Sequence, residues 1–491
     1  MSTGQRLPTP LASHRSLCRT NNQAALAEPV NDPGPSIRHF ARTCARASQE
    51  IDLDFGYHRP RVGFGKTQPA MAHVTLQRNG FTLYGRRNWS MKLAMRLYAL
   101  ASFAVVLAVR PRRRLVVTGG FAMASFDHYA KSLARHGVPS VSLVPSLLPI
   151  HQRDSFDLTW IDTAPEWLPR RLRRLISPMS ALCWLIHNAK VSVSPIGGAS
   201  VLGWVGLDRL EILLLRWKGI RSICIAVGGD FYRNADIQDP SLRWALQVSY
   251  PVDAREHTFV ERRLRRWERH ADIVLEGALY VDGGSRTDLL SPQPNVVDVR
   301  PNSRHERVPE ETGSGRKGPI RVIHAPNHRA FKGTEFVTDS IEELRSEGWD
   351  IELDLLEGAP HQTVLERMAE ADIAIDQLIY AGYGLFGIEA MAAGLPVIAN
   401  IDSQPFRLLM TRYSFLSECP IVSATPETLT LRLRDLLADR EALRSLGQRG
   451  HAYARQFHSY ESWFALWQVF EDLDFDGARL CKLNQRALYS G

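Results

Sequence analysis

A glycine-rich stretch at residues 380–400 has the residue types needed to hold a phosphate-bearing ligand. An apolar run ends near Asp376, and a helix is predicted to begin close to Ile388. Between them the loop is predicted to turn at three glycines: Gly382, Gly384 and Gly387. Glycines let a backbone approach a ligand, and the amides at a helix N-terminus favour an anion such as a diphosphate. Glu389, in the predicted first turn, could accept hydrogen bonds from the two adjacent hydroxyls of a ribose. A small-residue helix packed on a sheet, with Glu389 only favourable to the helix dipole, explains this stretch alone equally well.

A second segment, residues 324–334, carries two cations in a loop at the carboxyl end of a predicted strand. Arg329 and Lys332 could neutralise the negative charge that develops on a diphosphate leaving group. Alone, this segment is explained more simply as a solvated basic turn. Because it precedes the Glu389 helix at a suitable distance along the chain, we favour a phosphate-binding function.

The two segments resemble the signature of retaining, nucleotide-sugar-dependent glycosyltransferases of the GT-B fold, of the family-4 type. Residues 389–398 match the second half of that signature residue for residue, while its first Glu falls at Ala381. A branch of the family concerned with surface polysaccharides agrees better. Its Asp-Gln-Leu and aromatic-Gly pairs match residues 376–378 and 383–384, and its His-x-Pro-x-x-Arg-x-x-Lys-Gly-Thr element matches residues 324–334.

The resemblance implies transfer of a hexose from a nucleotide-sugar donor to a saccharide or lipid-linked acceptor, with retention, in polysaccharide or glycoconjugate biosynthesis. It implies neither a metal nor a cofactor. Arg329 and Lys332 would hold the diphosphate, Glu389 would bind the ribose, and the leaving diphosphate would help deprotonate the acceptor. The expected donor-binding residues are Tyr383, Gly384, Leu385, Phe386, Gly387, Ile388 and Glu389.

Strands and helices alternate in both halves of the chain, which is typical of doubly wound parallel sheets. We therefore predict an α/β protein of the GT-B class, with two facing Rossmann-like domains and a ligand cleft between them. The predicted parts are a poorly ordered extension (1–70), an acceptor domain (71–305), a linker (306–318), a donor domain (319–460) and a C-terminal helix with a tail (461–491). An aromatic stripe in residues 460–473 (Trp463, Phe464, Trp467 and Phe470) predicts core packing.

The sequence marks the residues that would bind the acceptor less specifically than those that would bind the donor. Five residues are candidates: Gly119, Gly120, Asp127, His128 and Asp230. The glycines are placed where the family has its first glycine loop, whereas the others are explained as well by exposed helix positions or a turn. The histidines that relatives carry on one strand would fall at Val193 and Pro195, which cannot transfer a proton.

The chain has 491 residues and a formal charge of +8, and only eight of its 60 basic residues are Lys. The excess is spread along the chain, which argues against a nucleic-acid-binding arm and fits an anionic substrate or an anionic membrane surface. The mostly apolar segment 91–109, flanked by arginines, is predicted to be a buried or partly buried helix, with an interfacial helix and a membrane-spanning helix as the alternatives. Because none of the six cysteines forms a CxxC pair, we expect a reducing, cytoplasmic location, with peripheral contact at the inner membrane face left open.

The sequence leaves three other functions open. A GT-B sugar-nucleotide epimerase would use the same fold and phosphate chemistry without an acceptor. A catalytically silent scaffold is suggested by the apolar residues Ala381, Val193 and Pro195. A nicotinamide-binding Rossmann protein needs G-x-G-x-x-G after its first strand, which Gly119-Gly120 does not supply.

Overall fold

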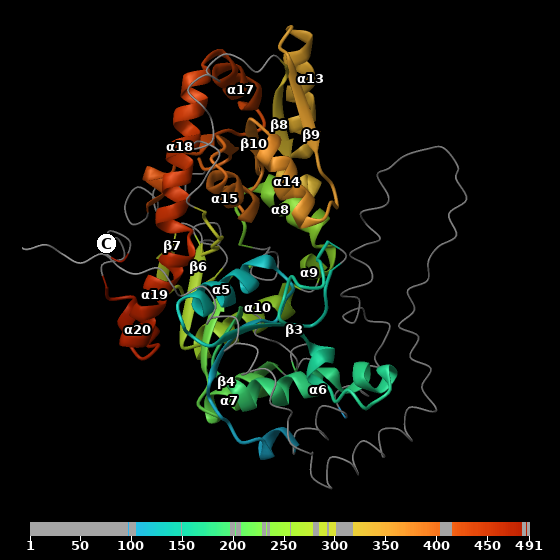
Figure 1. The fold of residues 1–491 in the computed structure, drawn as a ribbon, viewed down its shortest axis with the longest axis vertical. Coiled ribbons are helices and arrows are strands. Elements are labelled where there is room, and N and C mark those ends of the chain that lie inside the picture. Colours follow the sequence, from blue (N-terminus) through green and yellow to red (C-terminus); the bar gives the residue numbers. More distant parts are fainter. Residues whose placement is uncertain are drawn as a thin grey trace, which may run out of the picture. The chain divides into compact units, whose positions relative to one another are not determined.

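The computed structural model describes residues 97, 105–148, 150–196, 202, 208–227, 232, 236–255, 257–277, 284–291, 294–300, 318–402, 415–483 and 488. These residues form two parallel sheets covered by helices, which is the predicted GT-B architecture of two Rossmann-like α/β parts (Figure 1). Three predictions lie largely or wholly outside the described residues: the extension 1–70, the linker 306–318 and Asp230.

The first sheet has the strand order β3-β2-β1-β4-β5-β6-β7, and every pairing is parallel. Its strands are β1 (Leu115–Gly119), β2 (Ser140–Val144), β3 (Leu158–Thr159), β4 (Ala189–Pro195), β5 (Arg221–Ile225), β6 (Ile273–Gly277) and β7 (Leu289–Ser291). Neighbouring residues of β1 point to opposite faces, as Val117 and Val116 show. Val117 packs with helices α6 (Arg170–Asn188), α7 (Asp208–Trp217) and α10 (His257–His270). Val116 packs with α5 (Ala124–Arg135) and α19 (Tyr460–Asp472).

The second sheet has the order β12-β11-β10-β8-β9, again with parallel pairing throughout. Its strands are β8 (Ile320–His324), β9 (Ile351–Leu355), β10 (Ile373–Ile375), β11 (Val397–Ala399) and β12 (Val422–Ser423). Helices α13 (Thr334–Ser346) and α17 (Leu429–Ala438) cover one face. The other face packs against α14 (His361–Glu370), α15 (Leu385–Ala392) and α18 (Arg440–Phe457). Helix α8 (Pro240–Ser249), which lies between β5 and β6 in the sequence, joins this second core.

The C-terminal helix α19 returns to the first sheet (Figure 1). Trp463, Trp467 and Phe470 are at most 2% exposed and pack with the strands of that sheet. The prediction that the aromatic stripe serves core packing is therefore confirmed, and helix α19 ties the end of the chain to its first half.

The apolar segment 91–109 is described only at Leu97 and from residue 105 onward, where residues 105–108 are helical. Val106 is fully buried in the first core, whereas Leu107 is 38% exposed. Within the described ranges, no helix has both the length and the apolar character required to cross a bilayer.

Replacing Trp467 tests how strongly α19 holds the first sheet. We expect Trp467→Ala to destabilise the fold by about 3–5 kcal/mol, because a fully buried indole leaves a large cavity. Trp244→Ala on α8 is a matched control, since Trp244 is 64% exposed and surface changes alter stability by only about 0.5 kcal/mol. Differential scanning fluorimetry compares the two midpoints. Equal midpoints would show that α19 contributes little.

Candidate functional site

The order of the second sheet marks one position for ligand binding. Strands β8 and β10 are neighbours, but the connection after β8 leads to β9 on one side, whereas the connection after β10 leads to β11 on the other side. In open α/β sheets, ligands bind at the carboxyl ends of the strands at this switch point. The loops that follow β8 and β10 carry the predicted phosphate-binding residues (Arg329, Lys332 and residues 383–389).

A buried ion pair joins these two loops. Lys332 ends the short helix α12 (Arg329–Lys332), and Gly333 then adopts a left-handed conformation, with φ 73°. The Lys332 ammonium forms an ion pair with Asp376 Oδ1 and donates a hydrogen bond to Gln377 Oε1 at 3.1 Å. The side chains of Lys332 and Asp376 are 9% and 0% exposed. Lys332 therefore lies at the switch point, with one of its three N–H donors left after these two interactions.

Asp376 also fixes the start of α15. Its Oδ2 accepts a hydrogen bond from the Gly384 amide at 2.6 Å, and Gly384 is the N-cap of the helix. A Cβ atom at Gly387 would lie 2.8 Å from the same oxygen, so glycine is required there by close approach. The predicted turn at Gly387 is therefore wrong, because this glycine lies inside the helix, whereas Gly382 has the expected positive φ of 120°.

The helix begins at Leu385, about one turn earlier than predicted, so Glu389 lies in its second turn. Two of the five predicted anion-binding amides are already used: Gly384 donates to Asp376, and Ile388 donates to the Gly384 carbonyl at 3.2 Å. The amides of Leu385, Phe386 and Gly387 have no acceptor among the described residues. Three adjacent N–H groups at the positive end of a helix can bind a phosphate.

Arg329 has two carboxylate partners in the structure. Its Nε donates to Glu335 at 2.8 Å, and its Nη1 donates to Glu357 at 2.7 Å. The Arg329 side chain is 40% exposed, so these pairs are weak and accessible to a competing anion. A diphosphate would replace the carboxylates around this guanidinium.

Glu389 is paired with a residue that the sequence analysis did not identify. His361, the first residue of α14, donates from Nε2 to Glu389 Oε1 at 2.7 Å. This hydrogen bond raises the pKa of His361 above its ordinary value of 6.5. No local motif marks His361; its only sequence signal is its place after β9, a neighbour of β8. Its side chain is 38% exposed, whereas that of Glu389 is 9% exposed.

The predicted donor-binding residue Tyr383 directs its hydroxyl into the core. It is 1% exposed, and its hydroxyl is hydrogen-bonded to His458 Nε2 at 3.0 Å and lies 3.3 Å from the Tyr453 hydroxyl. Its side chain thus packs in the core between the second sheet and helices α14, α15 and α18. Any contact between Tyr383 and a donor would come from its backbone.

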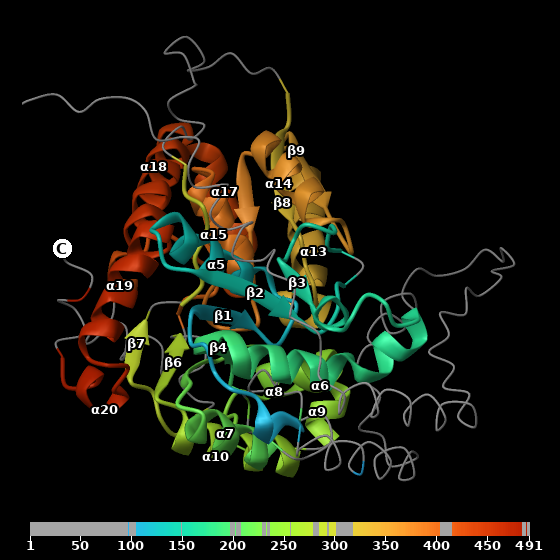
Figure 2. The same ribbon diagram turned by 60° about the horizontal axis from the view of Figure 1, so that its bottom comes forward.

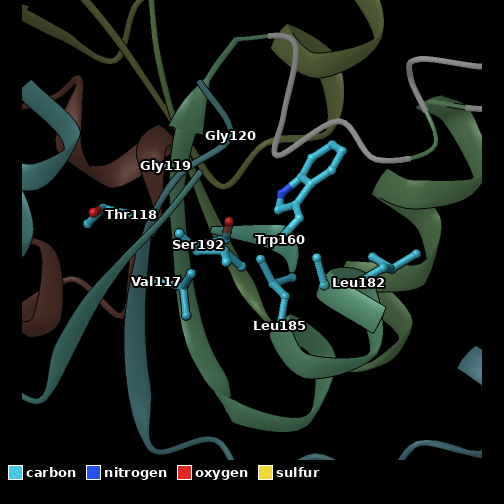
Figure 3. A pocket seen from close by; sticks show the side chains of 10 residues that line it. Val117, Thr118, Gly119, Gly120, Trp160, Leu182, Leu185 and Ser192 are labelled. Carbon is cyan, nitrogen blue, oxygen red and sulfur yellow. The ribbon is translucent and has the colours of Figure 1, made fainter. Parts of the chain in front are cut away.

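The predicted glycine loop of the first sheet lies at that sheet's own switch point, between β1 and β4. Gly119 and Gly120 have φ values of 140° and 88°, and a Cβ at Gly119 would collide with the Leu143 carbonyl. Both glycines line a small pocket together with Trp160 and Ser192 (Figure 3). Thr118 also lines this pocket, and its hydroxyl donates to the Phe126 carbonyl at 2.5 Å.

The polar acceptor candidates have partners inside the protein. Asp127 is 5% exposed, binds Lys131 at 2.6 Å and accepts a hydrogen bond from Ser142 at 3.2 Å; burial raises its pKa to about 6. His128 Nδ1 lies 2.7 Å from the Tyr460 hydroxyl, and burial lowers the pKa of His128 to about 4. The positive charges of Lys131 and His361 lower that pKa further.

Apolar residues occupy the strand positions where relatives carry histidines. Val193 is fully buried in β4, and Pro195 ends that strand. Among the described residues, no group of His, Cys, Asp or Glu side chains is arranged to hold a metal ion.

Comparison with known proteins gives likenesses of fold only. No family model matches the chain, and no curated protein matches it. Sucrose-phosphate synthase from Thermosynechococcus elongatus is 15% identical, with 74% of this chain and 99% of that chain covered and a TM-score of 0.46. The Anabaena protein HepE, solved with UDP and glucose, is 12% identical, with 74% and 100% covered and a TM-score of 0.45. A provisionally assigned UDP-N-acetylglucosamine 2-epimerase from Listeria monocytogenes is also 12% identical, with 74% and 98% covered and a TM-score of 0.40. Because these TM-scores lie below 0.5, the likenesses do not decide the function of this chain.

A glycine substitution tests the close approach at Asp376. Gly387→Ala should destabilise the fold by about 1–3 kcal/mol, because the methyl group would collide with the Asp376 carboxylate. That carboxylate cannot move away easily, since its two oxygens bind Lys332 and the Gly384 amide. Gly450→Ala in α18 is the matched control. The added methyl group would meet its nearest atom, in the Met391 side chain, at an ordinary distance of 3.4 Å. We therefore expect Gly450→Ala to raise the stability of the fold by about 0.4–1 kcal/mol. Thermal midpoints shifting in the same direction would contradict this account.

The pair between His361 and Glu389 predicts a dependence of stability on pH. Because the folded-state pKa of His361 is raised, its charged form stabilises the fold fully below about pH 6.5, and this contribution is lost as the pH rises through the raised value. At about pH 6 we expect the thermal midpoint of the wild type to be higher than that of His361→Gln. At alkaline pH this difference should disappear. Gln keeps a hydrogen-bond donor but does not titrate, so a difference that stays constant with pH would exclude the charged pair.

Proposed function

We propose that this chain is a nucleotide-sugar-dependent glycosyltransferase that binds its donor at the β8–β10 switch point. One observation carries the proposal: the Lys332 ammonium lies beside Gly384, the N-cap of α15, where three amides have no acceptor among the described residues, and Glu389 follows one turn later on the same helix. Amides and ammonium suit a diphosphate. A carboxylate beside them suits the ribose hydroxyls of the same nucleotide.

The proposed reaction is hexosyl transfer with retention. The bond between the anomeric carbon and the diphosphate oxygen breaks, and the acceptor hydroxyl oxygen bonds to that carbon. Negative charge develops on the leaving diphosphate, where the α15 amides, Arg329 and Lys332 would stabilise it. The acceptor proton passes to a leaving phosphate oxygen, which suits a site with Val193 and Pro195 where relatives carry histidines.

We assign the glycine loop at Gly119 and Gly120 to the acceptor side, together with Asp127, His128 and Asp230. The acceptor class that fits the sequence resemblance is a saccharide or lipid-linked saccharide of polysaccharide or glycoconjugate biosynthesis. Peripheral contact with an anionic membrane would bring a lipid-linked acceptor to this side.

Isothermal titration calorimetry with UDP, GDP, ADP, CDP, TDP and their sugars tests the donor site. One nucleotide should bind the wild type, and Glu389→Gln and Arg329→Gln should each weaken it by about 1.5–3 kcal/mol, because each loses a charged hydrogen-bond partner. Arg432→Gln, on the exposed surface of α17, is the control and should bind normally. Lys332→Ala is a poorer test, since it leaves the buried Asp376 carboxylate without its cation and would destabilise the fold.

The outcomes separate the alternatives. Absence of nucleotide binding by the wild type would overturn the donor site. Binding with no product for any acceptor would favour a silent scaffold, which the apolar residues Val193 and Pro195 suggest. An altered sugar nucleotide formed without an acceptor would identify an epimerase.

A further inference from the structure

Helices α7 and α10 present a basic outward face on the first sheet. Their inward residues, among them Ile212, Leu215, Leu264 and Trp267, are buried in the same core. The two helices contact each other and lie side by side (Figure 2). The exposed residues of α7 are Arg209, Leu213, Arg216 and Trp217, and those of α10 include Arg262, Arg265 and Arg269. Their spacings of three, four and seven residues place each set along one side of its helix.

The positive charge of this face is concentrated, and among the described residues few carboxylates balance it at the surface. Arg216 donates to His270 Nδ1 at 3.3 Å, which links the two helices. Burial lowers the pKa of His270, and the charges of Arg216, Arg269 and Arg209 lower it further. Glu211 and Glu268 cannot balance them at the surface, because both are buried; Glu261 forms an ion pair with Arg265.

Large apolar side chains lie among these arginines. Trp217 is 65% exposed and Leu213 is 45% exposed. At the end of α7, Lys218 lies 4.5 Å from the centre of the Trp217 ring and donates to the carbonyls of Leu107 and Val109, both at 2.7 Å. The Leu107 side chain is itself 38% exposed.

We propose that this outward face of α7 and α10 docks onto an anionic lipid bilayer. Arginines bind lipid phosphates, while indole and leucine side chains enter the boundary between headgroups and acyl chains. A nucleic acid would use the arginines, but the exposed leucines would gain nothing from its phosphate backbone. This inference deepens the membrane contact of the proposed function by naming its surface, and that surface lies on helices outside the donor site.

Vesicle flotation tests the surface with phosphatidylcholine alone and with phosphatidylcholine mixed with phosphatidylglycerol. Wild type should bind the anionic vesicles, and high salt should weaken the binding. The triple variant Arg209→Gln/Arg216→Gln/Arg269→Gln should bind about 100-fold more weakly, since each cation near an anionic leaflet contributes to affinity. The double variant Leu213→Ser/Trp217→Ser should also bind more weakly. The weakening should persist at high salt, because this variant loses apolar contacts with the bilayer and no charge.

A matched control removes the same charge elsewhere. Arg432, Arg444 and Arg449 are exposed on α17 and α18 of the second sheet, and changing all three to Gln should leave vesicle binding unchanged. Equal loss in this control, equal binding to uncharged vesicles, or binding to RNA without binding to anionic vesicles would each overturn the proposal. Circular dichroism checks folding, and nucleotide calorimetry on the triple variant shows whether the donor site is intact, so the two proposals fail separately.

Discussion

The buried ion pair between Lys332 and Asp376 is the interaction on which the candidate site depends. A charge in the interior is costly unless it is paired, so each group holds the other in place. Because one follows β8 and the other follows β10, the pair ties together the loops on both sides of the switch point. The second oxygen of Asp376 binds the Gly384 amide and fixes the start of α15. The three unused amides of that helix are then held at a defined distance from the ammonium.

Much of the second sheet could be predicted from the sequence, because its elements are short apolar runs bounded by Gly, Pro or charged residues. The pattern predicts a strand at 320–324 and a helix at 440–457, and β8 and α18 begin and end at these residues. The first sheet was harder to predict. Helix α6 was missed because it opens with four arginines in five residues and carries Pro178 inside, which resembles a charged loop more than a core helix. Packing of Leu182 and Ile186 on the sheet overrides these local signals.

The residue types of the candidate site could be predicted, but their partners could not. Glu389 belongs to a recognisable local motif, whereas its partner His361 lies 28 residues earlier. Tyr383 was assigned to the donor because it precedes Gly384, yet its hydroxyl contacts His458, which is 75 residues away. Such contacts are decided by how helices pack on the sheet, and no local spacing encodes them. The same limit explains the early start of α15, which depends on Asp376, eight residues before its N-cap.

Under the proposed function, donor binding is an exchange of partners, because the key groups are already satisfied within the protein. A diphosphate would replace Glu335 and Glu357 at Arg329, and ribose hydroxyls would replace His361 at Glu389. Exposed ion pairs contribute only about 0–1 kcal/mol each, so Arg329 can give up its carboxylates at little cost. Removing either member of the Lys332–Asp376 pair would strand a buried charge, so that pair must persist in the bound state. The two cations would therefore act differently: Arg329 changes partner, while Lys332 holds the loops in place and offers its remaining N–H to the phosphate.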